Sequence, residues 1–185
     1  MIFNLELITQ IKKNILVYHT IFDKIDLKGE YWESILDKSF NDLNIKSEWY
    51  ENSHKIGIDI LTDDFGRISC KGGILYTKKL VISGSRTTSH PTLEDKIKFL
   101  DDKKVDTYFC LAKKKPFDGK YHLYIFNSDC LDHSSMMWEN TYRGYKGTVE
   151  DFTILIESKM SDQIWYHINK NLLPEPFIID ISEPI

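Results

Sequence analysis

The sequence predicts an α/β domain in which helices come first and a strand-rich core follows. Apolar residues recur at helical spacing up to about residue 43. From residue 54 onward, short runs with alternating apolar residues are separated by Gly, Pro and Asp turn signals, and one helical segment after Pro91 interrupts them. The expected order over residues 30 to 112 is helix, three strands in a meander, helix, strand. The 185 residues are expected to form one folding unit.

Two helices and a short strand are expected in the first 52 residues. The first helix covers about Phe3 to Ile25 and ends at the break Asp26-Leu27-Lys28-Gly29. The second covers Glu30 to Leu43 and carries Glu33 in its first turns. Residues 48 to 52 are expected to form a short strand.

The most informative stretch follows, and it predicts a β-hairpin. Residues 54–61 and 67–71 are short runs with alternating apolar residues, and Asp63-Asp64-Phe65-Gly66 between them is typical of a turn. Asp59 lies inside the first run and Lys71 inside the second. We therefore expect the carboxylate and the ammonium to face each other across the hairpin.

The remaining core elements follow in order. The second hairpin strand is expected to continue through Ile74-Leu75-Tyr76, and a further strand covers Leu80-Val81-Ile82. Pro91-Thr92 begins a helix with its apolar residues on one face. Two strands are then expected, at Val105 to Ala112 and at Tyr121 to Phe126.

The C-terminal third gives weaker signals. Phe152 to Ile156 is expected to be a strand and Asp162 to Leu173 a helix, with His167 as a packed helix residue. The tail, Pro174 to Ile185, holds three of the five prolines and is expected to be an irregular extension.

Composition excludes several classes of protein. The chain is 42% hydrophobic and 28% charged, as in globular proteins, and no apolar run or leader predicts membrane insertion or secretion, so a cytoplasmic location is expected. The net charge of −4 argues against nonspecific coating of nucleic acid. Three dispersed cysteines in strand-like surroundings (Cys70, Cys110 and Cys130) favour reduced buried thiols over zinc or disulfides, and the six histidines show no ligand spacing.

Asp59 and Lys71 form the candidate site. Asp59 lies between Ile58 and Ile60, so period-two alternation places it on the opposite face from them, where a buried unpaired carboxylate is costly. The alternative is an acid on the solvated face of a half-exposed strand. A lysine beside a carboxylate, however, is typical of metal-assisted phosphodiester hydrolysis, and Gly72-Gly73 after Lys71 leaves space for a DNA backbone or marks a bulge.

Asp59, nine intervening residues and then Ser69-Cys70-Lys71 resemble the motif of the PD-(D/E)XK nucleases, specifically type II restriction endonucleases. Residues 84–88, 92–96 and 159–165 are also similar to stretches of restriction enzymes. The resemblance implies a restriction-endonuclease-like core, an α-β-β-β-α-β mixed sheet flanked by helices. It divides the chain into an N-terminal helical element (1–29), a catalytic core (30–126) and a C-terminal extension (127–185).

This sequence departs from the family pattern at the second acid. Gly57-Ile58 lacks the proline before Asp59, and Ser69 stands where a metal-binding acid is usual. The resemblance implies that a glutamate from a helix replaces it, and two candidates stay open: Glu94 on the following helix and Glu33 on the preceding one. Asp59, this glutamate and the Cys70 carbonyl would hold Mg²⁺, while Lys71 positions or deprotonates the attacking water.

DNA contacts are expected mainly from the polar segment after residue 82. Arg86 suits a guanine edge, and the neighbouring hydroxyls suit phosphates, although a plain polar loop is the alternative. The full set of candidate DNA-binding residues is Lys78, Lys79, Ser85, Arg86, Thr87, Thr88, Ser89, Arg143, Lys146 and Lys159, with Tyr145 and Ser158 as weaker additions. The run Lys113-Lys114-Lys115 is expected to be a solvated loop.

The sequence thus predicts a homodimeric, Mg²⁺-dependent restriction endonuclease that cuts a short site in double-stranded DNA, with the N-terminal helices as the dimer contact. A cognate DNA methyltransferase would belong to the same system without binding to it. Two alternatives remain: a DNA-binding module of the same fold that no longer cuts, and a structure-specific repair or RNA nuclease.

Overall fold

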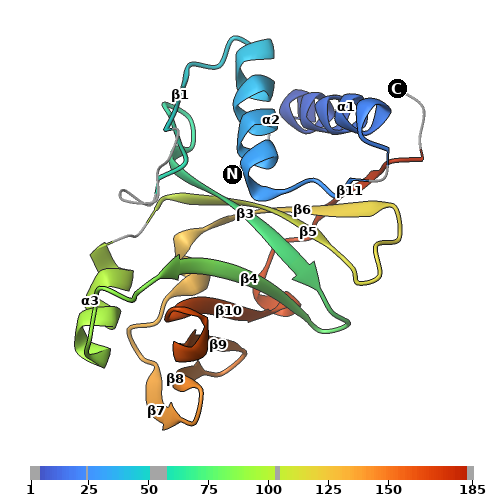
Figure 1. Ribbon diagram of the computed structural model, residues 1–185. Coiled ribbons are helices and arrows are strands. Elements are labelled where there is room, and N and C mark those ends of the chain that lie inside the picture. Colours follow the sequence, from blue (N-terminus) through green and yellow to red (C-terminus); the bar gives the residue numbers. More distant parts are fainter. Residues whose placement is uncertain (1–4, 24, 51–57, 103–104, 183–185) are drawn as a thin grey trace.

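A computed structural model describes residues 5–23, 25–50, 58–102 and 105–182 (Figure 1). Three α-helices are present in these residues: α1 (Leu5–Ile21), α2 (Gly29–Asp42) and α3 (Leu93–Asp102). The strands up to α3 are β1 (Ser47–Trp49), β2 (Ile60–Thr62), β3 (Gly66–Leu75) and β4 (Lys79–Arg86). Those after α3 are β5 (Thr107–Lys113), β6 (Lys120–Asn127), β7 (Met137–Thr141), β8 (Gly144–Val149), β9 (Phe152–Glu157), β10 (Gln163–Asn169) and β11 (Phe177–Asp180). Short 3-10 turns are η2 (Ser128–Leu131), η3 (Ser158–Met160) and η4 (Lys170–Leu172).

All these strands join one mixed sheet. Its order is β11-β6-β5-β3-β4-β10-β9-β8-β7, and β1 and β2 extend from β3. β3 and β5 pair in parallel, with α3 in the connection between them, and the other pairs are antiparallel. The chain is therefore a mixed α/β protein, as predicted, and the described residues form a large sheet with few helices.

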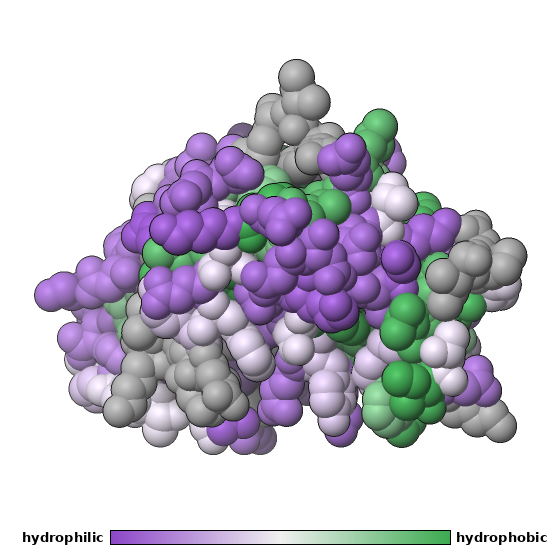
Figure 2. All heavy atoms as spheres, turned by 90° about the horizontal axis from the view of Figure 1, so that it is seen from above, coloured by the Kyte–Doolittle hydropathy of each residue, from purple (hydrophilic) through white to green (hydrophobic). Residues whose placement is uncertain are grey.

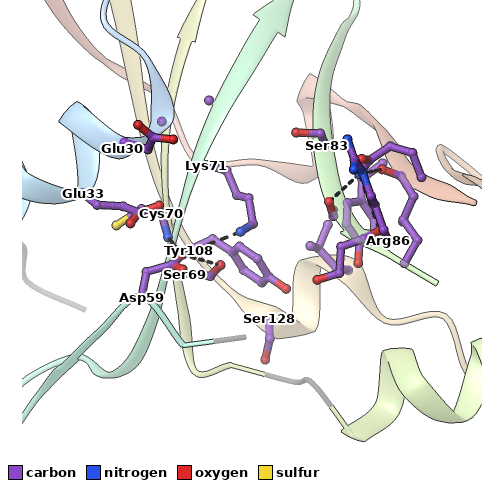
Figure 3. A pocket seen from close by; sticks show the side chains of 18 of the residues that line it. Glu30, Glu33, Asp59, Ser69, Cys70, Lys71, Ser83, Arg86, Tyr108 and Ser128 are labelled. Atoms are coloured by element: carbon purple, nitrogen blue, oxygen red, sulfur yellow. Dashed lines mark hydrogen bonds and ion pairs between the residues drawn. The ribbon is translucent and has the colours of Figure 1, made fainter. Parts of the chain in front are cut away.

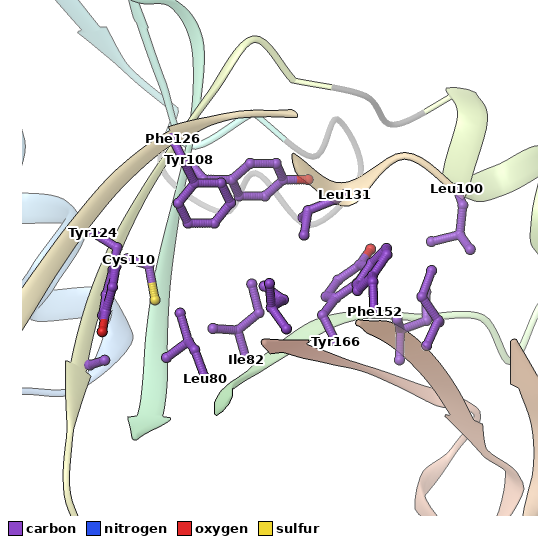
Figure 4. Packing of buried hydrophobic residues seen from close by; sticks show 14 of the residues in the cluster. Leu80, Ile82, Leu100, Tyr108, Cys110, Tyr124, Phe126, Leu131, Phe152 and Tyr166 are labelled. Atoms are coloured by element: carbon purple, nitrogen blue, oxygen red, sulfur yellow. The ribbon is translucent and has the colours of Figure 1, made fainter. Parts of the chain in front are cut away.

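Two cores lie on the two faces of the central strands. On one face α1 and α2 pack over β3, β5, β6 and β11 (Figure 1), and the Trp32 indole donates a hydrogen bond to the Phe109 carbonyl at 3.1 Å. On the other face, side chains of β5 and β6 share a core with those of β4, β9 and β10, as Figure 4 shows for Cys110, Tyr124, Ile82 and Phe152. Side chains from strands that lie apart in the sheet, such as β6 and β9, share this second core, so the sheet must curve around it.

The predicted hairpin is present. β2 and β3 pair with Ile60 opposite Ile68 and Thr62 opposite Gly66, and Gly66 has a φ of 64°, which favours glycine. β2 begins at Ile60, while residues 54–57 of the predicted strand lie outside the described residues. α3, β5, β6 and β9 also fall where the sequence placed them. β1 (Ser47–Trp49) overlaps the start of the strand predicted at residues 48–52, of which residues 51 and 52 lie outside the described residues.

The prediction of a helix over residues 162–173 is wrong. Residues 163–169 form β10, which lies between β4 and β9, so His167 is a strand residue. Ile164, Tyr166 and Ile168 are buried at period two, and this alternation outweighed a spacing that also fits one helical face. In apolar runs this short, periodicity alone does not distinguish a helix from a strand.

Three further strands were not predicted. β7 and β8 form a hairpin that continues the sheet beyond β9. Within the tail expected to be irregular, β11 pairs with β6 and buries Ile179. The residues after 127 thus contribute five strands to the sheet. No helix among the described residues has the length and apolar character needed to cross a membrane.

Candidate active site

Backbone hydrogen bonds hold Asp59 immediately before β2. Its N–H donates to the Ile68 carbonyl at 2.9 Å, and its own carbonyl accepts from the Tyr50 N–H at 3.0 Å. These bonds fix the residue at the entry of the hairpin, and Asp59 is buried, at 6% exposure. The alternative of a solvated acid on the wet face of the strand is therefore wrong. A carboxylate this deep requires compensating contacts.

One tripeptide of β3, Ser69-Cys70-Lys71, supplies three such contacts. Asp59 Oδ2 accepts hydrogen bonds from the Cys70 N–H at 2.6 Å and from the Ser69 hydroxyl at 3.1 Å. The Lys71 ammonium forms an ion pair with the same oxygen at 3.6 Å. The predicted proximity of Asp59 and Lys71 across the hairpin is confirmed. Ser69, at the position of the expected second acid, supplies a hydrogen bond to Asp59 and no charge.

The Cys70 side chain faces away from this group. It belongs to the core beneath α1 and α2, and burial, followed by the charges of Asp59 and Glu33, raises the pKa of its thiol well above the ordinary value. The thiol is therefore a neutral core group, which leaves the backbone carbonyl as the part of Cys70 suited to a hard cation. The three cysteines are free; Cys110 is also buried and Cys130 is half-buried.

Glu33 approaches the site from α2. Figure 3 shows its side chain on the same side as Asp59, with Glu30 nearby on the same helix. Burial, and next the charge of Asp59, raises the pKa of Glu33 to about 7, while Lys71 and a hydrogen bond with Trp49 act in the opposite direction. A carboxyl group whose proton affinity is raised by a neighbouring carboxylate forms with it a donor pair that a divalent cation would stabilise.

Glu94, the other candidate for the missing acid, lies elsewhere. It is exposed in the first turn of α3 and does not line the pocket that contains Asp59. Of the two glutamates that the sequence left open, the structure brings only Glu33 to Asp59 and Lys71. The described residues contain no ready-made cluster of three His, Cys, Asp or Glu side chains. A metal here would therefore need the Asp59–Glu33 pair together with backbone oxygen or water.

The site opens into a pocket of about 1070 Å³. The acidic residues and Lys71 line one side, the end of β4 with Ser83 and Arg86 lines the other, and Tyr108 lies between them (Figure 3). Tyr108 is the parallel-strand partner of Ser69, which places it beside the catalytic candidates. Sequence reasoning missed Tyr108, Glu30 and Gln163, because their place at the pocket depends on strand pairing and helix docking that no local motif records.

The two glycines after Lys71 differ. A Cβ at Gly72 would meet nothing within 4 Å, so the pocket is open there. A Cβ at Gly73 would lie 2.8 Å from Leu80 and 3.1 Å from Cys110, so this glycine is needed for packing. Of the two glycines, only Gly72 therefore borders open space.

The residues of the predicted DNA-binding segment, 85–89, differ in their position relative to the pocket. Ser85 and Arg86 line the pocket, and Thr88 and Ser89 are exposed beyond it. Thr87 is 0% exposed and its hydroxyl donates to the Asp162 carbonyl at 3.0 Å, so the prediction that Thr87 contacts DNA is wrong. Its polar side chain serves a loop contact and not a ligand.

The remaining basic candidates lie outside the pocket. Lys78 and Lys79 are at the β3–β4 turn, at the opposite end of β4 from Arg86. Arg143 pairs with Glu157 at 3.8 Å and Lys146 pairs with Glu139 at 2.8 Å, both around the β7–β8 hairpin. Lys159 lies in η3. None of these five basic residues lines the pocket.

Comparison of the sequence with models of known protein families and with curated proteins gives no significant match. The function is therefore inferred from the geometry and chemistry of the site.

Proposed function

We propose that this protein is a Mg²⁺-dependent endonuclease of the type II restriction class, hydrolysing phosphodiester bonds in duplex DNA at the Asp59–Lys71 site. One observation carries the proposal: a buried carboxylate held 3.6 Å from a lysine ammonium, beside a second carboxyl group, at one side of a large pocket. The order α2, β2, β3, β4, α3, β5 supports a restriction-endonuclease-like core, with the short β1 as an addition.

The donor set fits a hard cation. Asp59, Glu33 and the Cys70 carbonyl are oxygen ligands, and Mg²⁺ is usually held by one or two carboxylates with water and phosphate oxygens. A bound Mg²⁺ supplies charge stabilisation at the scissile phosphate and a lowered pKa for a coordinated water. The Ser69 hydroxyl and the Cys70 N–H keep Asp59 in place. Lys71, 24% exposed at its side chain, orients the attacking water and balances charge at the phosphate.

A second candidate is a DNA-binding protein of the same fold that does not cut. It is favoured by Ser69, which donates to Asp59 where a metal-binding acid is expected, and by the pKa of Glu33 near 7. A structure-specific repair or RNA nuclease is the third, since a large pocket also admits single strands or frayed ends.

The deciding experiment incubates supercoiled plasmid with the purified protein and Mg²⁺ or Ca²⁺, with Asp59→Asn as the matched inactive variant. Nicked and linear DNA with Mg²⁺ alone, absent in the variant, is the expected result. Binding without cutting at any Mg²⁺ concentration favours the non-cutting module, and activity confined to single strands, RNA or branched DNA favours the third candidate. A protein that neither binds nor cuts DNA would contradict the proposal.

We further propose that the chain acts as a homodimer, because double-strand cleavage with one site per chain is most simply done by a two-fold dimer. Apolar side chains are exposed at the C-terminal end of α1 and just beyond it: Val17, Ile21, Phe22 and Ile25. Figure 2 views the molecule from above, where polar side chains cover most of the surface and apolar ones gather in smaller patches. The cytoplasmic location and the accompanying DNA methyltransferase also remain proposals.

A further inference from the structure

Lys96 is the buried cation that the proposed reaction does not use. It lies on α3, whose start is fixed because the Asp95 N–H donates to the Thr92 hydroxyl at 3.1 Å. Lys96 is 2% exposed, although a lysine on a short helix of a protein this size normally reaches solvent. A buried ammonium is costly unless its three donors are all paired.

The three donors of Lys96 meet three oxygens from two separate segments. Nζ donates to the Thr87 carbonyl at 3.1 Å and to the His90 carbonyl, both in the loop after β4. It also pairs with Asp162 Oδ2 at 3.1 Å, in the turn before β10. The ammonium thus joins α3 to both of these segments.

The two segments are also bonded directly to each other. The Thr87 N–H and hydroxyl both donate to the Asp162 carbonyl, at 3.1 and 3.0 Å, and the Thr88 hydroxyl donates to the Ser161 carbonyl at 2.7 Å. Ser161 and Asp162 have φ angles of 58° and 50°, in the left-handed region that non-glycine residues rarely adopt. A strained turn of this kind persists only where its surroundings hold it.

The residues held in this way flank the pocket. Arg86 immediately precedes Thr87, Gln163 immediately follows Asp162, and the two are paired across β4 and β10. Both line the pocket, and the Gln163 side-chain amide donates to the Gly84 carbonyl at 2.5 Å. Arg86 lies across the pocket from Asp59 and Glu33 (Figure 3).

We propose that Lys96 is a positioning residue: by joining the loop after β4 to the turn before β10, it sets Arg86 and Gln163 at the wall of the pocket that receives DNA. The ligand named here rests on the proposed function. Lys96 itself touches no DNA, so it acts on affinity only through Arg86 and Gln163. Removing its charge frees Asp162 and the two loop carbonyls to turn towards water, and the wall moves with them.

The first test is a double-mutant cycle of Lys96→Met with Arg86→Gln, measuring affinity for a fluorescein-labelled mixed-sequence duplex in Ca²⁺. Each single variant is expected to weaken binding roughly tenfold. The double variant is expected to bind no more weakly than the single variant of lower affinity, because in Lys96→Met Arg86 has already lost its position. An additive loss of about a hundredfold would overturn the proposal. Lys98→Met, an exposed position on the same helix, is the matched control and should bind like wild type.

Kinetics separate positioning from general damage. With Mg²⁺, Lys96→Met is expected to raise KM for plasmid about tenfold and to leave kcat within a few-fold of wild type. A fall in kcat with unchanged KM would place Lys96 in the chemical step and contradict the proposal. Asp162→Asn is the second variant if Lys96→Met does not fold, since Asn tolerates positive φ, and its smaller loss of affinity must also be non-additive with Arg86→Gln.

A further arm needs no DNA. Hydrogen exchange of residues 83–90 is expected to accelerate in Lys96→Met, because the Thr87 N–H loses its fixed acceptor, while exchange in α1 and α2 stays unchanged. Unchanged exchange in residues 83–90 would overturn the positioning role. If wild-type protein neither binds nor cuts DNA, the proposed function fails, and this arm alone then decides whether Lys96 holds the wall.

Discussion

Asp59 and Lys71 are the residues on which the proposed chemistry depends. We expect Asp59→Asn and Lys71→Met each to reduce Mg²⁺-dependent cleavage by about a thousandfold, because metal and water placement affect the transition state. Duplex affinity in Ca²⁺ should change only a few-fold, since phosphate contacts dominate it. Plasmid cleavage and fluorescence anisotropy measure the two quantities. Lys79→Met, at the far end of β4, is the matched control, and near-normal cutting by Lys71→Met would refute the site.

The source of the second carboxylate is a separate question at the same scale. Glu33→Gln is expected to lose most Mg²⁺-dependent cutting, at least a hundredfold, because it removes one of two charges near the metal position. Glu94→Gln should keep wild-type activity, since Glu94 is exposed outside the pocket. The two substitutions are equally isosteric, so each controls for the other. The reverse result would identify Glu94 on α3 as the second metal-binding carboxylate.

Glu33 also predicts a pH dependence of stability without metal. Its pKa is about 7 in the folded protein against an ordinary 4.5, so between these values the folded state binds more protons than the unfolded state. The free energy of unfolding in EDTA should therefore fall as pH rises from about 4.5 to 7. For a half-buried group screened by water, we expect a loss on the order of 1 kcal/mol.

Urea unfolding of wild type and Glu33→Gln at both ends of this pH window gives the measurement. The difference in stability between the two proteins should shift in favour of the variant as pH rises. A constant difference would mean that Glu33 titrates normally and does not share the field of Asp59.

At the scale of the element, β3 carries two glycines with opposite requirements. Gly73→Ala should destabilise the protein by about 1 to 3 kcal/mol, because the added Cβ lies 2.8 Å from Leu80 in a packed core. Gly72→Ala should change stability by less than about 0.5 kcal/mol, as it faces open space. Denaturant unfolding of the two variants is the test. Equal destabilisation would show that the effect comes from the strand backbone and not from crowding of the added Cβ.

At the scale of the whole molecule, the exposed end of α1 is the candidate dimer surface. Ile21→Glu, at a residue 69% exposed, should convert a dimer to a monomer in sedimentation experiments without loss of folding, since a charge there meets water in the monomer and an apolar partner in the dimer. Met137→Glu is the matched control, because β7 lies at the other end of the sheet. Wild-type protein that is monomeric both free and on DNA would contradict the proposed assembly.

Local signals in the sequence were sufficient for the N-terminal helices, the β2–β3 hairpin and the meeting of Asp59 with Lys71. An Asp-Asp-Phe-Gly turn between alternating runs fixes the strand pairing over a few residues, so opposite side chains can be named without the rest of the fold. The tertiary structure alone decided what depends on distant contacts. The docking of α2 brought Glu33 and not Glu94 to the site, pairing with β4 and β9 made residues 163–169 a strand, and the contact with Asp162 buried Thr87. Each of these outcomes depends on a partner far away in the chain, which no local periodicity encodes.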